Sequence, residues 1–191
     1  MQYQYGRGAI SDGCDTNALV APTRKLSSNA TTIIIYFSRS GNTERQAQVA
    51  AEYLAADLYE LVACEPYPAN YRASVDRATR EREAQAWPAL KSADIPNLMQ
   101  YQTVLLAHPV WAMTLANPMR SFLEQFGKQL AGKTIADFST NAGYGAGETQ
   151  TVITKLIPHL RLLPNYTIED RKAVANRIEF EDWLKQIQEE S

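Results

Sequence analysis

One stretch of the chain carries most of the information about its fold: TIIIYFSRSGNTE, residues 32–44. Ile33 to Phe37 form a near-continuous apolar run, which is typical of a central parallel strand covered on both faces. A polar segment follows at 38–43, and a helical pattern begins near Glu44. This order of strand, hydroxyl-rich turn and helix places unpaired backbone N–H groups at a helix N-terminus, where the helix dipole also favours negative charge. The stretch therefore predicts a phosphate site at the end of a buried strand.

The composition is that of one α/β domain with an extension. The chain has 191 residues, of which 45% are hydrophobic and 21% charged, so a substantial core can form. Its 19 basic and 21 acidic residues give a net charge of -2, whereas a nucleic-acid-binding protein usually carries a basic excess. No apolar run approaches the roughly 20 residues of a membrane span. We therefore expect neither nucleic acid nor a membrane as a partner.

The cysteines and histidines argue against a disulfide framework and a metal site. Cys14 and Cys64 are far apart and form no CxxC pair, a pattern that fits a reducing compartment, so we expect a cytoplasmic protein. His108 and His159 are too few and too scattered to form a histidine metal site.

The pattern divides the chain at residue 31. Residues 1–31 are rich in glycine, serine and asparagine, have no sustained apolar period and do not read as a secretory signal peptide. We expect them to form a flexible N-terminal extension. The alternative, that they lie along the domain or along a partner chain, stays open. Residues 32–191 form the expected domain.

From residue 33 onwards, strand and helix patterns alternate. The expected strands are 33–37, 58–62, 103–107, 134–138 and a weak edge strand at 160–168 that Pro164 interrupts. The expected helices are 42–56, 71–85, 118–126, 148–157 and 176–188. This alternation predicts an α/β fold: a three-layer, doubly wound sheet of five parallel strands with helices on both faces. Right-handed crossovers then bring the loops after the first, third and fourth strands to one edge of the sheet.

The first of these loops has the composition of a phosphate site. Ser38, Ser40, Asn42 and Thr43 offer side-chain donors, and Gly41 lets the backbone approach closely. The lone positive charge of the loop, on Arg39, either screens the phosphate or points into solvent. The loop has no lysine for a P-loop, and no G-x-G-x-x-G follows the first strand as a Rossmann fingerprint would require.

The other two loops supply groups suited to a planar ring. Trp111 is either a plug at the rim of the sheet or a stacking platform. Gly143 and Gly145 leave backbone N–H groups free to face a polar ring edge, and Tyr144 covers a ring face or caps the phosphate side. A phosphate, a planar apolar ring and a hydrogen-bonding ring edge together describe flavin mononucleotide (FMN).

Three motifs carry a resemblance to a known family. Residues 36–43 match Y-F-S-x-[ST]-G-N-T in full, residues 66–71 read P-Y-P-x-x-Y, and residues 75–78 read V-D-R-A. From Ile33 to Ile187 the chain resembles the flavodoxin-like family. The resemblance implies a flavodoxin-like fold, with strand order 2-1-3-4-5, and bound FMN.

The resemblance also assigns cofactor-binding residues by position. It gives the phosphate to Ser38, Ser40, Gly41, Asn42 and Thr43. It gives the ring to Pro109, Val110, Trp111 and Ala112, and its polar edge to Thr140, Asn141, Ala142 and Gly143. The expected set is completed by Arg39, Tyr144 and Gly145.

The second loop departs from the family pattern. Relatives often read Y-P-x-W-W-G there, whereas residues 108–113 read HPVWAM, without the second tryptophan and without the glycine. A positive φ costs more at Ala112 and Met113 than at glycine. We therefore expect the one-electron reduced flavin to be unstable here.

Two uses of the flavin remain open. In the first, the chain is an electron carrier that docks a redox partner protein. In the second, it is an NAD(P)H-dependent FMN oxidoreductase that reduces quinones or similar small acceptors. A scaffold without cofactor is disfavoured by the intact phosphate loop, and a homodimer stays open. No residue is a firm catalytic candidate: His108 and Tyr144 are the weak ones, and His108 is expected more as a packed residue.

Overall fold

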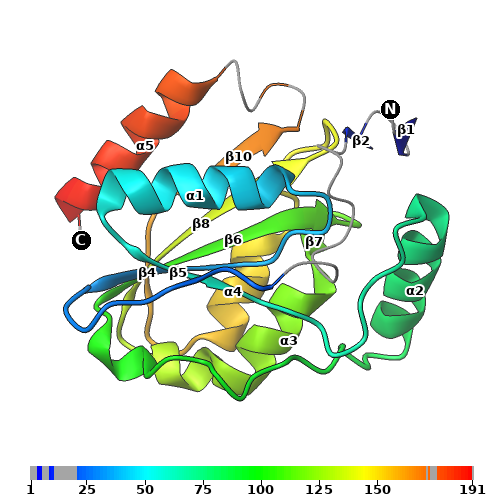
Figure 1. Cartoon of the computed structure of the whole chain (residues 1–191), viewed down its shortest axis with the longest axis horizontal. Helices are drawn as coiled ribbons and strands as arrows, with labels where there is room; N and C mark the ends of the chain where they lie inside the picture. Colours follow the sequence, from blue (N-terminus) through cyan, green and yellow to red (C-terminus); the bar gives the residue numbers. More distant parts are fainter. Residues whose placement is uncertain (1–3, 6–8, 11–20, 171, 173–175, 191) are drawn as a thin grey trace.

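The centre of the molecule is a mostly parallel β-sheet. The computed structural model describes residues 4–5, 9–10, 21–170, 172 and 176–190 (Figure 1). Within them the sheet runs in the order β10-β8-β6-β4-β5-β3, with β7 paired to β6 and β9 paired to β8. The strands of this sheet are β3 (Arg24–Lys25), β4 (Thr32–Tyr36), β5 (Asp57–Glu60), β6 (Thr103–Trp111), β7 (Thr114–Leu115), β8 (Thr134–Asn141), β9 (Arg161–Leu162) and β10 (Tyr166–Glu169).

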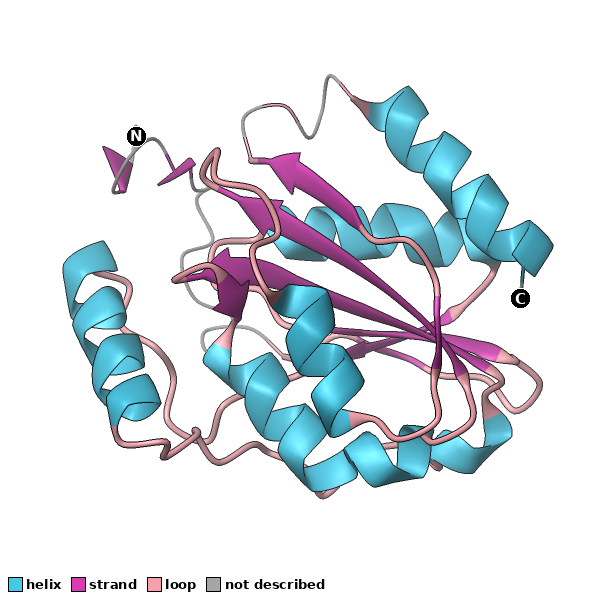
Figure 2. Cartoon of the chain, turned by 180° about the vertical axis from the view of Figure 1, so that it is seen from behind, coloured by secondary structure: helices cyan, strands magenta, loops and turns pink. Residues whose placement is uncertain are grey.

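Helices cover both faces of the sheet and make a three-layer α/β fold (Figures 1 and 2). One face packs against α1 (Asn42–Leu54) and α5 (Arg177–Glu190), whose buried side chains include Ala47, Ala50, Phe180 and Leu184. The other face packs against α3 (Asn117–Phe126) and α4 (Thr149–Leu156). The β-branched run of β4 is fully buried between the two layers, because both faces of this central strand are covered.

The remaining elements lie around this framework. They are α2 (Tyr71–Glu83), two short 3₁₀ helices at Leu98–Gln100 and Gly127–Leu130, and a separate two-stranded pair, β1 (Gln4–Tyr5) with β2 (Ala9–Ile10). In Figure 2, α2 stands apart from the helices that cover the sheet, next to the end of the sheet where β6 turns into β7. Asn117 at the start of α3 ties α2 down, since its side-chain Nδ2 donates to the carbonyl of Ala78 and to Glu81 Oε2.

The expected strand and helix alternation is confirmed, and the carboxyl ends of three strands meet at one edge. Strand β6 lies between β4 and β8, parallel to both, with Tyr36 beside Ala107 and Ala107 beside Phe138. Strand β5 pairs in parallel on the other side of β4. The loops after β4 and β8 and the end of β6 therefore converge, as the loop pattern predicted.

Two strand predictions need correction. The third strand does not end at Ala107: β6 continues to Trp111 and turns back as β7, so the predicted loop over residues 108–114 is largely a β-hairpin. The weak edge strand is two short strands, β9 and β10, separated around Pro164, because proline cannot donate to a ladder.

The expected boundary at residue 31 is also too late. Strand β3 pairs antiparallel with β5 and becomes an edge of the sheet, so the sheet is larger than the five strands expected. Arg24 holds it there through Asp94 Oδ2 (2.7 Å) and the carbonyl of Glu60 (2.7 Å). Further along, the buried carboxylate of Asp57 accepts bonds from the backbone N–H and the hydroxyl of Ser27. Most of the predicted extension, residues 1–20, lies outside the described residues apart from β1 and β2.

Two classes of feature are absent from the described part of the chain. None of its helices is long and apolar enough to cross a bilayer. Nor do its histidine, cysteine, aspartate and glutamate side chains form any group of three or more that could hold a metal ion.

Candidate functional site

The turn between β4 and α1 leaves the start of a helix open. Gly41 is the N-cap of α1 and, as glycine, has no side chain with which to cap the helix. Its φ of 86° is left-handed, which glycine adopts without strain. Ser38 Oγ accepts a bond from Gly41 N (3.0 Å) and so fixes the turn from within. The start of α1 therefore lies directly after a tight glycine turn, the kind of helix start at which backbone N–H groups and the helix dipole favour an anion.

A hydroxyl of the first turn of α1 meets a hydroxyl at the end of β8. Thr43 Oγ1 lies 2.8 Å from Thr140 Oγ1, across 97 residues of sequence. A small hollow of about 90 Å³ is lined by Ser38, Arg39, Ser40, Thr43, Tyr71, Pro109, Val110, Trp111, Thr140, Asn141, Ala142 and Asp170. The three predicted loops thus form one hollow, which we call the phosphate hollow.

An acidic residue lines the phosphate hollow. Asp170 follows β10, and its backbone N–H donates to the carbonyl of Asn141 (2.9 Å). Burial raises the pKa of its carboxyl to about 6, against the lowering effect of hydrogen bonds from the side chains of Asn42 and Thr140. Its Oδ1 is buried without a hydrogen-bond partner among the described residues. A carboxyl that resists ionisation can stand beside an anion at lower electrostatic cost.

A larger hollow adjoins the first and has an apolar wall. It has a volume of about 440 Å³ and is lined by Tyr71, Val110, Ala112, Met113, Asn141, Ala142 and Tyr144. Tyr144 is 52% exposed and Met113 46% exposed, so both stand at its mouth. We call it the ring hollow, because a flat apolar group fits its lining.

The hairpin that forms one wall of the ring hollow has a strained turn. Trp111 pairs with Thr114, and the two residues between them, Ala112 and Met113, have φ values of 50° and 62°. Positive φ at both central residues is the geometry of a type I′ hairpin turn, which Asn-Gly usually occupies.

The third loop holds this turn in place. Gly147 has a φ of 60°, and a Cβ on it would lie 2.1 Å from the carbonyl oxygen of Met113. The backbone N–H of Glu148 donates to that same oxygen (2.8 Å). Only glycine permits this approach, so the hairpin and the start of α4 are locked together at the site.

The comparisons with known proteins agree with this geometry. The family model described as Flavodoxin matches residues 31–187. The chain belongs to the flavodoxin family. A comparison with curated proteins gives no match.

Solved flavoproteins share the fold of this flavodoxin-family chain. A structure from Bacteroides uniformis ATCC 8492, described as a flavoprotein, has a TM-score of 0.70 at 23% identity and covers 83% of this chain and 99% of its own. One from Bacteroides eggerthii DSM 20697 has a TM-score of 0.64 at 27% identity, with 77% and 95% covered. A Lactobacillus acidophilus NCFM flavoprotein in complex with FMN has a TM-score of 0.63 at 22% identity, with 77% and 97% covered.

Most of the residues expected from the flavodoxin resemblance lie together. All but four of them line one of the two hollows. The four exceptions are Gly41, Asn42, Gly143 and Gly145. Gly41 and Asn42 still shape the helix start, whereas the third-loop glycines have a different role from the one predicted.

The expectation that Gly143 and Gly145 present free N–H groups is wrong. Asn141 Oδ1 accepts from Gly143 N (2.7 Å) and from Gly145 N (3.2 Å), while its Nδ2 donates to Thr167 Oγ1 (2.9 Å). Both glycine N–H groups therefore donate to the side-chain oxygen of Asn141, and these two bonds stabilise the turn. The sequence offered this signal, because asparagine commonly bonds its own turn two residues ahead.

Trp111 combines the two roles that the sequence left open. Its ring meets Phe37 (centroids 5.5 Å apart) and Tyr67 (4.9 Å) edge to face, and it packs on the core. It nevertheless remains partly exposed and lines the phosphate hollow. The contacts with Phe37 and Tyr67 thus fix the orientation of the indole, while part of its surface stays exposed to the hollow.

His108 is a core residue, as the sequence favoured, and the structure gives no support to the weaker alternative of a proton donor. Its side chain is fully buried and lines neither hollow. Burial lowers its pKa to about 4, so it is neutral at pH 7.

Two site residues were missed by the sequence argument. Tyr71, the N-terminal residue of α2, lines both hollows, and only its place in P-Y-P-x-x-Y marked it beforehand. Asp170 carried no sequence signal, since it follows a short edge strand in a chain with many surface carboxylates.

Proposed function

We propose that this chain binds FMN and transfers electrons through it. The observation that carries the proposal is the start of α1, which follows the glycine turn at Gly41 and lies next to the hydroxyls of Ser38, Ser40, Thr43 and Thr140. A phosphate monoester suits this set of groups, because helix N-terminal N–H groups, hydroxyls and the helix dipole all favour a small dianion. The bound flavin would supply the redox chemistry, since it accepts and donates one or two electrons.

The other residues of the site have positioning roles. Val110, Ala112, Met113 and Tyr144 offer apolar surface for the flavin ring in the ring hollow. Tyr71 stands where the two hollows meet, between the phosphate end and the ring end. The hairpin, locked by Gly147, keeps the ring wall rigid, and rigidity lowers the entropic cost of binding.

The test is the chromophore of the purified protein. We expect a yellow protein with flavin absorbance bands that releases FMN, and not riboflavin or FAD, when it is denatured. A colourless protein that neither quenches the fluorescence of added FMN nor shifts its absorbance would contradict the proposal.

The carrier role is the first of two candidate uses, with a redox partner protein as electron donor or acceptor. The exposed free thiol of Cys64 suits the reducing conditions of the cytoplasm, where we place this function. A carrier should show no steady turnover of NAD(P)H with a quinone unless a reductase is added.

The second candidate is an NAD(P)H-dependent oxidoreductase for small acceptors. It is favoured by the mouth of the ring hollow, where Met113 and Tyr144 are each about half exposed and a small reactant can approach the ring. Oxidation of NAD(P)H at 340 nm, with FMN-loaded protein and a quinone alone, supports this candidate. A rate equal to that of free FMN contradicts it.

A further inference from the structure

A third hollow lies on the far side of the hairpin. We propose that it binds a small planar molecule carrying a carboxylate or sulfonate, with the acid group at Arg82 and the ring against Trp111. The proposal deepens the proposed function and rests on it, because it names the class of small molecule that the flavin site takes beside the cofactor.

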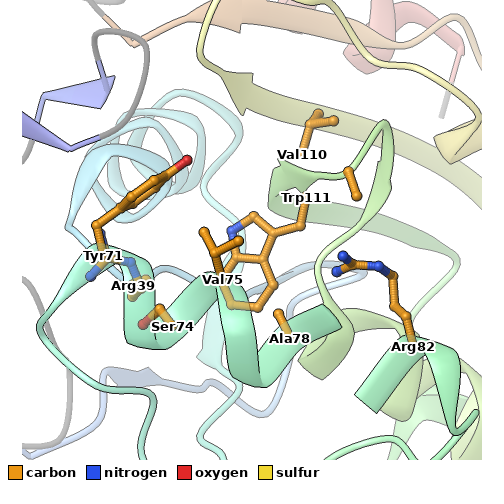
Figure 3. A pocket seen from close by; sticks show the side chains of 9 residues that line it. Arg39, Tyr71, Ser74, Val75, Ala78, Arg82, Val110 and Trp111 are labelled. Carbon is orange, nitrogen blue, oxygen red and sulfur yellow. The ribbon is translucent and has the colours of Figure 1, made fainter. Parts of the chain in front are cut away.

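The hollow is a groove between α2 and the β6–β7 hairpin (Figure 3). Its volume is about 240 Å³, and it is lined by Arg39, Tyr71, Ser74, Val75, Ala78, Arg82, Val110, Trp111 and Ala112. Figure 3 shows Tyr71 towards one end and Arg82 at the other, with the indole of Trp111 between them, beside Val75 and Ala78. We call it the α2 groove.

The middle of the α2 groove is lined by apolar side chains, although Val75 and Trp111 are partly exposed to solvent. Val75 is 41% exposed on a helix that is otherwise rich in charge. Trp111, held edge to face by Phe37 and Tyr67, faces the same space with part of its ring. A rigid indole from the hairpin and a valine from α2 together suit a flat aromatic group, which gains from both ring contact and burial.

Among the described residues, the charged side chains that line the groove are both arginines. Arg39 and Arg82 line it, and no carboxylate stands among its described lining residues. Arg82 Nη2 donates to the hydroxyl of Thr79 (3.1 Å), a neutral acceptor that orients the guanidinium and leaves its charge in place. Arginine pairs with a carboxylate or sulfonate through parallel N–H bonds, and partial burial reduces screening of that pair.

The neighbouring Arg77 shows what a structural arginine looks like on the same helix. Its Nε lies 2.8 Å from Glu81 Oε1, and its guanidinium stacks 4.2 Å from the ring centroid of Tyr67. Arg77 therefore serves the packing of α2 against the core, whereas Arg82 faces the groove.

The groove adjoins the proposed cofactor site. Arg39, Tyr71, Val110 and Trp111 line both the groove and the phosphate hollow, and Ala112 lines both the groove and the ring hollow. A molecule in the groove would thus contact residues that also line the proposed cofactor site. This contact distinguishes a ligand subsite of the flavoprotein from an unrelated surface hollow.

The test is binding of 2-naphthoate and of its uncharged counterpart 2-naphthol to the FMN-loaded protein, measured by calorimetry. We expect naphthoate to bind at least tenfold more tightly than naphthol. Arg82→Gln should weaken naphthoate about tenfold, the equivalent of one charge-assisted hydrogen bond, and leave naphthol unchanged. Arg80→Gln is the matched control, because Arg80 is exposed on α2 and does not line the groove, and it should change neither.

A second variant tests the apolar part of the groove. Val75→Asp should weaken both ligands, and the helix content and melting temperature of each variant report on folding. Equal affinity for the two ligands, or naphthoate affinity unaffected by Arg82→Gln, would overturn the proposal. Binding of naphthoate to the FMN-free protein that disappears once FMN is loaded would do the same, because the groove would then be part of the cofactor site. The flavin absorbance of the same samples reports on the proposed function separately.

Discussion

Ala112 and Met113 have a backbone conformation that their side chains disfavour. Both have left-handed φ values, and such a conformation costs a non-glycine residue about 1–2 kcal/mol. Strain of this size persists where surrounding contacts over-determine it, and here the Met113 carbonyl is fixed by Glu148 N. The sequence correctly indicated that glycine is missing from this turn. It did not show that the turn keeps positive φ nevertheless. The expected instability of the one-electron reduced flavin stays a prediction.

Replacing Met113 by glycine should therefore stabilise the protein. Relief of strain outweighs the greater chain entropy that glycine loses on folding, for a net gain of about 0.5–1 kcal/mol. Chemical denaturation without added FMN measures it. Met99→Gly is the matched control: Met99 is 71% exposed and does not have a positive φ, so glycine there should destabilise. A loss of stability in Met113→Gly would show that the turn is not strained.

Asp170 contributes a pH-dependent charge to the phosphate hollow, which Arg39 also lines. Above about pH 6 its carboxyl is ionised and repels a phosphate dianion, whereas below that pH it is largely neutral. Asp170→Asn should therefore tighten FMN binding at pH 8 by on the order of tenfold. The gain should vanish near pH 4.5.

Fluorescence titration with FMN and with riboflavin separates the phosphate effect from folding. Riboflavin, which lacks the phosphate, should bind the two proteins equally. Asp76→Asn, an exposed substitution on α2 outside the hollows, should leave FMN affinity unchanged. Weaker FMN binding by Asp170→Asn would mean that the carboxyl helps to hold the cofactor.

The hairpin and the start of α4 form one unit at the scale of elements. The contact depends on Gly147, where any Cβ would collide with the carbonyl of Met113. Gly147→Ala should cost more than 2 kcal/mol of stability, since neither backbone can shift without breaking the bond to Glu148 N. FMN affinity should fall with it, because the ring hollow loses its wall.

Gly132 provides the control for this substitution. Its φ of 75° is also left-handed, but a Cβ there would meet no atom within 4 Å. Gly132→Ala should cost only the backbone term, about 1–2 kcal/mol, and leave FMN affinity intact. If the two variants lose equal stability, the close approach at Gly147 is not a determinant of the fold.

The strands predicted from sequence differ from the observed ones where contacts between distant parts of the chain determine whether a strand forms and where it ends. Apolar runs and helical periods located the strands and helices that the core requires. They did not reveal that β6 continues through His108 to Trp111, because Ala112-Met113 lacks the Asn-Gly signal of a hairpin. They also missed β3, whose Arg24-Lys25 is held by distant partners, Asp94 and Glu60, and has no strand period of its own.

Buried ionisable groups shape the stability of the whole molecule. Burial raises the pKa of the fully buried Asp137 to about 6, while the hydrogen bond that Gln150 Nε2 donates to its Oδ1 acts the other way. A native pKa above the unfolded value means that the folded state binds more protons, so this group lowers stability as pH rises from about 4 to 6. His108 has the opposite effect on stability. Its native pKa of about 4 lies below the unfolded value, so its contribution to stability increases as pH rises from about 4 to 6.

Asp137→Asn should therefore stabilise the protein at pH 7 by on the order of 2 kcal/mol. The variant should also gain stability more steeply than the parent between pH 4 and pH 6, because the opposing effect of Asp137 is gone and that of His108 remains. Denaturation midpoints across this range provide the measurement. Parallel pH profiles for the two proteins would exclude Asp137 as a titrating core group.

At the scale of the whole molecule, the sheet brings three loops together so that the start of α1 lies against the end of β8, where the hydroxyls of Thr43 and Thr140 meet. That this helix start receives the phosphate of FMN is the central claim, and the ratio of the dissociation constants of riboflavin and FMN tests it most directly. Two charge-assisted bonds to the phosphate contribute about 3 kcal/mol, so we predict that FMN binds at least 100-fold more tightly. Affinities within a factor of two of each other would contradict the claim.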